Sequence, residues 1–170
     1  MQTRIMPATA ADSDTICQLF EQAIAYQKEH NYIGWESYDK LRIEKDIDAQ
    51  LLFKILSNDQ VVGIFTIYYS DPLIWREMEK NDAIYIHRVV LNRKFQGIKL
   101  FKLALDWTME HARERGLNYI RIDTWAANEK IISYYKNYGF RFIENYTTGD
   151  TEELPVPHRN LNVTLLELAV

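Results

Sequence analysis

The chain has 170 residues, of which 47% are hydrophobic and 26% charged, and its formal net charge at pH 7 is -4. This length and apolar content predict a single domain over residues 1–170 with a buried core. The acidic balance argues against a nucleic-acid surface, which needs a basic face, and no apolar run approaches the roughly 18 residues of a membrane span. The single cysteine, Cys17, excludes an internal disulfide and a cysteine-based zinc cluster, so we expect a cytoplasmic protein.

The N-terminal part of the chain predicts a short strand near residues 4–7 and a helix from about residue 10 to residue 29. Thr9 and Asp12 have the spacing of a capping box, and apolar residues then recur at helical spacing. A polar, aromatic connection, HNYIGWESYD, leads to a weaker helical segment. Four apolar residues of that segment are expected near one face: Leu41, Ile43, Ile47 and Leu51.

Two apolar runs, LLFKILS and QVVGIFTIYY, predict a β-hairpin. They flank Asn58 and Asp59, residue types that tolerate the positive φ of a tight turn. The following segment, DPLIWREMEKND, interrupts the strand pattern with Pro72 and several charges. The run AIYIHRVVL at residues 83–91 resumes the pattern and predicts a third long strand.

From Gly97 the hydrophobic period changes to 3.6 residues, which predicts a helix that ends at Gly116. YIRIDTW is a further strand, Asn128 is a good N-cap for the helix EKIISYYKNY, and Gly139 is expected at the C-terminal end of that helix. GFRFIENY and NLNVTLLEL supply the last two strands. Because one helix joins strand 83–91 to strand 118–124, these strands should be parallel, and the sheet is expected to be mixed.

Basic residues gather around the glycine that precedes the long helix. The start of a helix offers unpaired N–H groups to an anion, and Gly97 lacks the Cβ that would hold a ligand away from the backbone. The alternative is that most of these bases are solvated surface residues. GxxxxGK[ST] and GxGxxG are absent here, so a phosphate ligand other than ATP or NAD is implied. The segment 83–105 contains five bases and no Asp or Glu: Arg88, Arg93, Lys94, Lys99 and Lys102.

At these residues the chain resembles the GCN5-related N-acetyltransferase (GNAT) superfamily. The family's motif Q/R-x-x-G-x-G/A at a helix start matches KFQGIK at residues 94–99, and its later Asn-helix-Tyr-GF segment matches NEKIISYYKNYGF. Two motif positions differ, since Lys94 replaces Arg or Gln and Lys99 replaces Gly or Ala. The resemblance covers about residues 83–145 and implies the GNAT fold, of the α/β (α+β) class. In that fold, helices flank a mixed, mostly antiparallel central sheet of six to seven strands with a central parallel βαβ unit.

The resemblance implies acetyl-CoA as the acyl donor and no metal. The pyrophosphate would lie over the helix start, and the pantetheine arm would run beside strand 83–91 like an added strand. The residues that this places against CoA are Val89, Val90, Leu91, Lys94, Phe95, Gln96, Gly97, Ile98, Lys99, Leu100, Asn128 and Tyr135.

The implied reaction is direct attack of a primary amine on the thioester, with both substrates bound together and no acyl-enzyme. An alkyl amine with a pKa of about 10.4 must first lose a proton. His87 resembles the strand histidine that serves as base in some arylalkylamine-type members, although it could equally be a core histidine, and His158 is a weaker candidate. The backbone N–H of Val89 would stabilise the oxyanion. Tyr135 would protonate the leaving thiolate, or only pack in the core.

The acceptor is the least defined partner. Family members line its pocket from the regions that here contain Trp35, Tyr38, Trp75 and His158, although surface packing would also explain the aromatic residues. The sequence does not distinguish between a polyamine, an amino acid, an aminoglycoside, an arylalkylamine and a protein N-terminus as the acceptor. The expected partner is therefore a small-molecule or peptide amine. Both a monomer and a homodimer remain open. The alternative function is a non-catalytic acyl-CoA sensor of the same fold.

Overall fold

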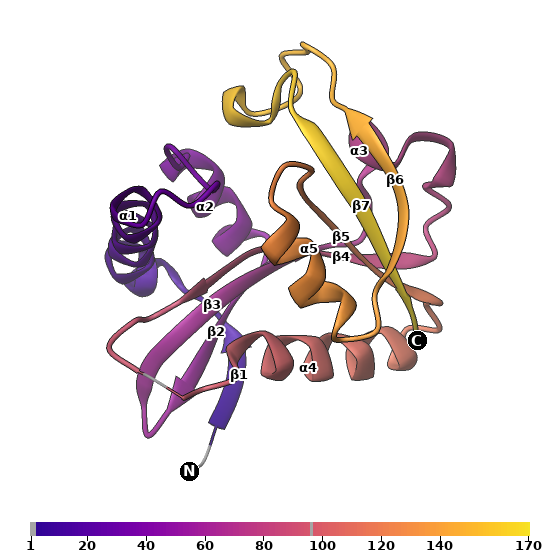
Figure 1. Ribbon diagram of the computed structural model, residues 1–170. Coiled ribbons are helices and arrows are strands. Elements are labelled where there is room, and N and C mark those ends of the chain that lie inside the picture. The colour runs from indigo at the N-terminus through magenta and orange to yellow at the C-terminus, as the bar shows by residue number, and fades with distance from the viewer. Residues whose placement is uncertain (1–2, 96) are drawn as a thin grey trace. The chain divides into compact units, whose positions relative to one another are not determined.

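The structure, a computed structural model, describes residues 3–95 and 97–170 and contains seven strands within those ranges (Figure 1). The strands are β1 (Thr3–Pro7), β2 (Leu52–Ser57), β3 (Gln60–Tyr68), β4 (Ala83–Leu91), β5 (Tyr119–Trp125), β6 (Arg141–Thr147) and β7 (Asn162–Ala169). The α-helices are α1 (Ser13–Glu29), α2 (Lys40–Asp48), α3 (Pro72–Trp75), α4 (Leu100–Glu114) and α5 (Glu129–Lys136). Short 3-10 helices are η1 (Ala10–Asp12), η2 (Arg76–Met78) and η3 (Val156–His158). Over the described ranges, every helix is too short or too polar to cross a membrane.

The strands form a mixed sheet in the order β1-β2-β3-β4-β5-β7-β6. β4 and β5 run parallel, with Ala83 opposite Tyr119, as expected for two strands joined by the crossover helix α4. The pairs β1–β2, β2–β3, β5–β7 and β6–β7 are antiparallel. The predicted fold class, a mostly antiparallel α/β sheet with one parallel βαβ unit, is therefore confirmed.

The chain divides into two compact units. Unit 1 comprises the residues up to Ile67 together with His87–Trp107, and unit 2 comprises Tyr68–Ile86 and Thr108–Val170. β4 and α4 each contribute residues to both units. A single domain over residues 1–170 stays a prediction.

In unit 1 the helices α1 and α2 pack beside each other and bury one core cluster (Figure 1). Cys17 lies in this cluster and is 8% exposed. The capping box is present, since the Thr9 backbone N–H donates to the Asp12 carboxylate at 2.8 Å. Asn58 and Asp59 have φ values of 48° and 62°, which confirms the left-handed hairpin turn. The expected apolar face of α2 was wrong at Leu41, which is 69% exposed because it lies two residues, about 200°, from the buried Ile43.

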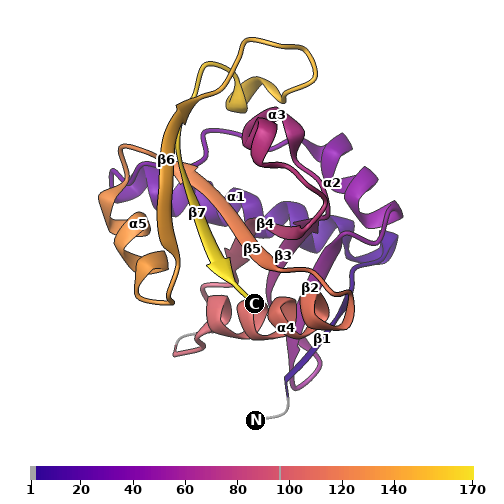
Figure 2. The same cartoon turned by 90° about the vertical axis from the view of Figure 1, so that its right-hand side faces the viewer.

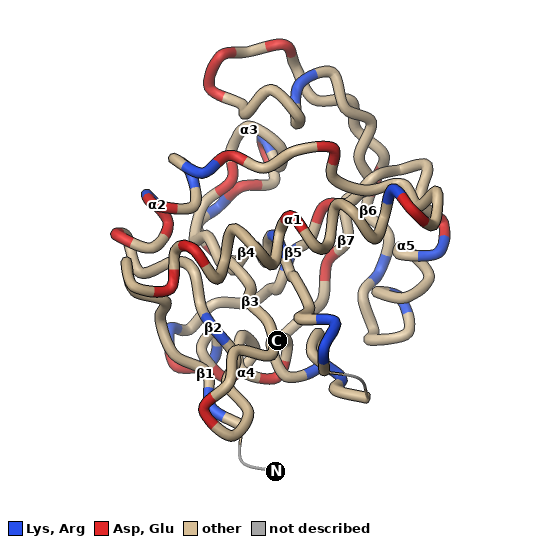
Figure 3. The backbone as a smooth tube through the Cα atoms, turned by 90° about the vertical axis from the view of Figure 1, so that its left-hand side faces the viewer, with Lys and Arg blue, Asp and Glu red and all other residues tan. Residues whose placement is uncertain are grey.

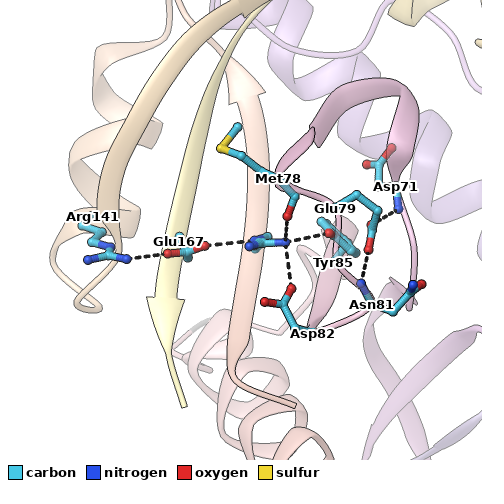
Figure 4. A network of polar contacts seen from close by, with 9 residues as sticks. Asp71, Met78, Glu79, Asn81, Asp82, Tyr85, Arg141 and Glu167 are labelled. Carbon is cyan, nitrogen blue, oxygen red and sulfur yellow. Dashed lines mark hydrogen bonds and ion pairs between the residues drawn. The ribbon is translucent and has the colours of Figure 1, made fainter. Parts of the chain in front are cut away.

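In unit 2 strand β7 lies between β5 and β6, and Figure 2 shows β6 and β7 side by side. A network of ion pairs and hydrogen bonds, buried at Arg121 and Glu167, links these strands to β4 (Figure 4). The Arg121 guanidinium donates to Glu167 at 3.0 Å and to the Tyr85 hydroxyl at 2.9 Å, and Arg141 donates to Glu167 at 2.6 Å. Since Arg121 and Glu167 are both buried, each charge needs the other, and the network fixes the register of the strands that carry them.

Local interactions explain the predicted end of α4 and the predicted start of α5. Gly116 has φ +68°, and its N–H donates to the Arg113 carbonyl at 3.0 Å, as a glycine that ends a helix does. Asn128 caps α5, because its side-chain oxygen accepts from the Ile131 N–H at 3.1 Å. The regular helix ends at Lys136, two residues before the expected end at Tyr138.

Candidate active site

The segment that follows β4 in unit 1 is held in a turn by Asn92. Its backbone N–H donates to the Val62 carbonyl at 2.9 Å, and its side-chain amide donates to the Val61 carbonyl at 2.8 Å. Its side-chain oxygen accepts from the Lys94 N–H at 3.1 Å, and its carbonyl accepts from the Phe95 N–H at 3.0 Å. Asn92 therefore fixes the start of this segment to β3 and turns the chain toward α4.

Gly97 lies in the left-handed region, with φ +78°, three residues before α4 begins at Leu100. A Cβ built at Gly97 would meet no atom within 4 Å, so the backbone on that side borders open space. At the start of α4 the Leu100 N–H donates to the Ile98 carbonyl at 2.9 Å. Because of the open space beside Gly97, a ligand can approach the backbone closely at that residue. Gln96, which belongs to the predicted motif, lies outside the described residues.

Positive charge surrounds this glycine, as Figure 3 shows for the segment between β4 and α4. Lys94 and Lys99 are exposed, and neither forms an ion pair within residues 3–95 and 97–170. Lys102, by contrast, donates to Asp106 one turn along α4 at 2.6 Å. The Arg93 guanidinium lies over the ring of Tyr26 on α1, with its Cζ 3.1 Å from the ring centroid. No sequence signal pointed to Tyr26, because the contact joins residues far apart in the chain.

β4 carries the predicted base, His87, and the predicted oxyanion donor, Val89, two residues apart in unit 1. His87, Arg88 and Val89 are partly buried, whereas Val90 is buried in the core under α1. Arg88 has φ 49°, which is rare for a non-glycine residue and unexpected inside a strand. Its side chain pairs with Asp46 on α2. Sequence reasoning counted Arg88 only as one of the bases near Gly97 and missed Asp46 and the left-handed backbone, for which Arg carries no preference.

Trp35 and Tyr38, the two predicted acceptor residues of unit 1, both lie against α1. Trp35 and Tyr38 both pack on Phe20, with ring centroids 5.5 and 5.6 Å away. The Tyr38 hydroxyl donates to Glu21 at 2.7 Å, and this hydrogen bond together with partial desolvation raises the pKa of Tyr38 to about 12. Tyr38 therefore stays protonated at neutral pH and holds a carboxylate at this position.

Tyr135 lies on α5 in unit 2, after the N-cap Asn128. Its ring contacts Tyr134 at 5.7 Å and Phe140 at 6.2 Å between centroids. Burial, and then the negative charge of Asp123, raise the pKa of the Tyr135 hydroxyl well above its usual value of 10.0. The hydroxyl keeps its proton at neutral pH, as a group that donates a proton to a leaving group must.

Trp75 and His158, both in unit 2, occupy different surroundings. Trp75 is 0% exposed and packs against Tyr85 at 5.8 Å and under the Arg121 guanidinium at 4.8 Å. This burial favours packing over a place in the acceptor pocket. His158 belongs to η3, and its carbonyl accepts from the Thr148 hydroxyl at 2.5 Å.

Comparison with known proteins shows the family and the fold of the chain. Residues 16–140 match the model of the Acetyltransferase (GNAT) family. The Bacillus subtilis (strain 168) protein named uncharacterized N-acetyltransferase YesJ is 21% identical over 156 residues, which are 84% of each chain. A GNAT-family acetyltransferase from Listeria monocytogenes 4b F2365 has a similar fold, with a TM-score of 0.78, 21% identity and coverage of 99% of this chain and 95% of that one. The PaiA N-acetyltransferase of Thermoplasma acidophilum, solved with coenzyme A, has a TM-score of 0.72 and 14% identity over the full length of both chains.

Proposed function

Because the chain belongs to the acetyltransferase (GNAT) family, we propose that it transfers an acetyl group from acetyl-CoA to a primary amine, with both substrates bound together. The observation that carries the proposal is the left-handed Gly97 before α4, with open space where a Cβ would stand. The PaiA protein of similar fold, which was solved with coenzyme A, supports the same donor.

The residues around Gly97 fit the pyrophosphate of CoA. Backbone N–H groups of the turn at Gly97, just before α4, would donate to phosphate oxygens, whereas the Leu100 N–H donates to the Ile98 carbonyl. Lys94 and Lys99 are exposed and would add positive charge on either side. The backbone of residues 89–91 would line the pantetheine arm along β4, because the Val90 side chain is buried in the core. Lys99 in place of the usual small residue does not remove a backbone donor, because its N–H stays in the chain.

The proposed chemistry assigns one step to each of three groups. His87, or a water that it holds, takes a proton from the ammonium group, so that the free amine nitrogen attacks the thioester carbonyl carbon. The Val89 backbone N–H donates to the oxygen of the tetrahedral intermediate. The intermediate collapses when the C–S bond breaks, and Tyr135 donates its proton to the leaving sulfur. The nitrogen loses its second proton in the same collapse, and this proton restores the Tyr135 hydroxyl. The products are the N-acetylated amine and CoA with a free thiol.

The test is thiol release from acetyl-CoA in the presence of a pooled panel of amines: polyamines, amino acids, aminoglycosides, arylalkylamines and peptides. We expect release that depends on the amine, with the acetylated product identified by mass spectrometry. A reaction without amine controls for thioester hydrolysis, and calorimetry measures CoA binding. CoA binding that weakens with salt, without release for any amine, would contradict catalysis and indicate an acyl-CoA sensor. Absence of CoA binding would refute the site around Gly97.

A further inference from the structure

The strand β4 contains one residue whose backbone departs from the strand conformation. Arg88 has φ 49°, between His87 and Val89, which we assign to proton abstraction and oxyanion stabilisation. A left-handed conformation is unfavourable for a non-glycine residue, and it persists only where the surroundings hold it. Within a strand it also redirects the adjoining peptide groups away from the regular ladder. One of these peptides carries the N–H of Val89.

The surroundings of Arg88 supply such a constraint from α2. The Arg88 guanidinium forms an ion pair with the carboxylate of Asp46. The Asp46 side chain is 5% exposed and that of Arg88 is 18% exposed, so both charges are largely removed from water. Breaking one partner of such a pair is strongly unfavourable, because the remaining charge stays buried. The pair therefore ties residue 88 to a helix that precedes it by about 40 residues.

β3 limits the same part of β4 from another direction. A Cβ built on Gly63 would lie 2.8 Å from the carbonyl oxygen of Val90 and 2.5 Å from Leu100, so only glycine permits this approach. Val90 is buried in the unit 1 core. The backbone from Arg88 to Val90 is thus fixed at one end by the Asp46 carboxylate and at the other by the backbone of β3.

We propose that Asp46 is a positioning residue for the acyl-transfer step: through its ion pair with Arg88 it sets the direction of the Val89 N–H toward the oxyanion. This inference rests on the proposed function, in which Val89 donates that hydrogen bond. Because the donor must lie in place before charge develops on the oxygen, loosening it affects the transition state more than the bound thioester. Asp46 would therefore influence turnover more than CoA affinity.

Three variants separate this role from general support of the fold. Asp46→Asn keeps the shape of the side chain but leaves the Arg88 cation without its charge partner. The double variant Asp46→Asn/Arg88→Asn removes both charges, and asparagine is one of the few residue types that adopts a left-handed conformation readily. Arg42→Gln is the matched control, because Arg42 lies 3.8 Å from the same carboxylate but is not part of β4.

The experiment measures kcat, the CoA dissociation constant, the melting temperature and the Val89 amide NMR resonance for each variant. We expect Asp46→Asn to lower kcat by about 10- to 100-fold, the effect of misplacing a catalytic group by up to 1 Å, with CoA affinity within about twofold of the parent. The double variant should recover most of kcat and return the Val89 resonance toward its parent position. Arg42→Gln should change none of these quantities.

Two results would overturn the inference: kcat of Asp46→Asn within twofold of the parent, or a parallel loss of kcat, CoA affinity and melting temperature without recovery in the double variant. The amide resonance keeps the test separate from the proposed function. If the parent acetylates no amine, the proposed function fails. A Val89 resonance that shifts in Asp46→Asn and returns in the double variant would still support the positioning role, and an unchanged resonance would refute it.

Discussion

Replacing Gly97 with alanine tests the proposed phosphate site with the smallest possible change. The new methyl group would meet no atom within 4 Å, so the structure predicts no steric clash within the described residues. The only internal penalty is the backbone strain of alanine at φ +78°, about 1–2 kcal/mol. If the segment around residue 97 relaxes from this conformation in the absence of CoA, CoA binding must restore the positive φ. The strain energy then lowers the affinity for CoA.

A strain of about 1–2 kcal/mol corresponds to a loss of affinity between roughly 5- and 30-fold. The melting temperature should fall by no more than about 2–4 °C per kcal/mol for a chain of this length. Gly116→Ala is a matched control, because Gly116 also has positive φ, at +68°, and open space for a Cβ, but lies at the opposite end of α4. It should lose similar stability and keep the parent affinity for CoA.

Isothermal titration calorimetry with CoA and thermal unfolding of both variants provide the two measurements. The reasoning is refuted if Gly97→Ala binds CoA as tightly as the parent, since the backbone of residue 97 then does not need its conformation for the phosphate. It is also refuted if both alanine variants lose affinity equally, because the loss would then follow from stability and not from position.

Three further predictions concern side chains of the site and of unit 2. Tyr135→Phe should lower kcat roughly 10²-fold at unchanged CoA affinity, and a parent rate with chemistry shown to limit turnover would reduce Tyr135 to a packing residue. His87→Ala should lower kcat/KM roughly 10²-fold, whereas a parent value would assign proton removal elsewhere. Burial and the Arg115 cation lower the pKa of His111, whose Nε2 lies 2.7 Å from the Tyr69 hydroxyl and 3.0 Å from Arg115 Nε. As pH falls below about 6.5, the unfolded chain therefore binds a proton at His111 before the folded protein does, which lowers stability. The melting temperature of the parent should drop between about pH 7 and pH 5, and that of His111→Gln should drop less. Equal drops in both proteins would contradict this interpretation.

The features that the sequence predicted correctly have causes within a few residues of chain. Hydrophobic periodicity located the strands and the long helices, and local chemistry located the hairpin turn at Asn58 and Asp59, the cap at Asn128 and the end of α4 at Gly116. The parallel pairing of β4 and β5 followed from a single connecting helix. These are interactions that a short window of sequence contains.

The features that sequence reasoning missed depend on contacts between distant segments. Arg88 adopts φ 49° in partnership with Asp46, and Arg93 stacks on Tyr26, but neither partner is close in sequence. The burial of Trp75 under Arg121 was also not evident from the sequence, and its place in the acceptor pocket stays a prediction. Such positions are set by tertiary packing, which a single sequence does not reveal.

The rate at which a thiol reagent modifies Cys17 reports local opening of the unit 1 core. The Cys17 thiol is buried in the core of unit 1, so a thiol reagent can modify it only when that core opens. The labelling rate of the native protein thus measures the opening free energy of unit 1 alone, whereas amide exchange at the Arg121 network measures that of unit 2. Equal free energies would mean that the two units unfold as one cooperative domain, and a lower value at Cys17 would mean that unit 1 opens by itself.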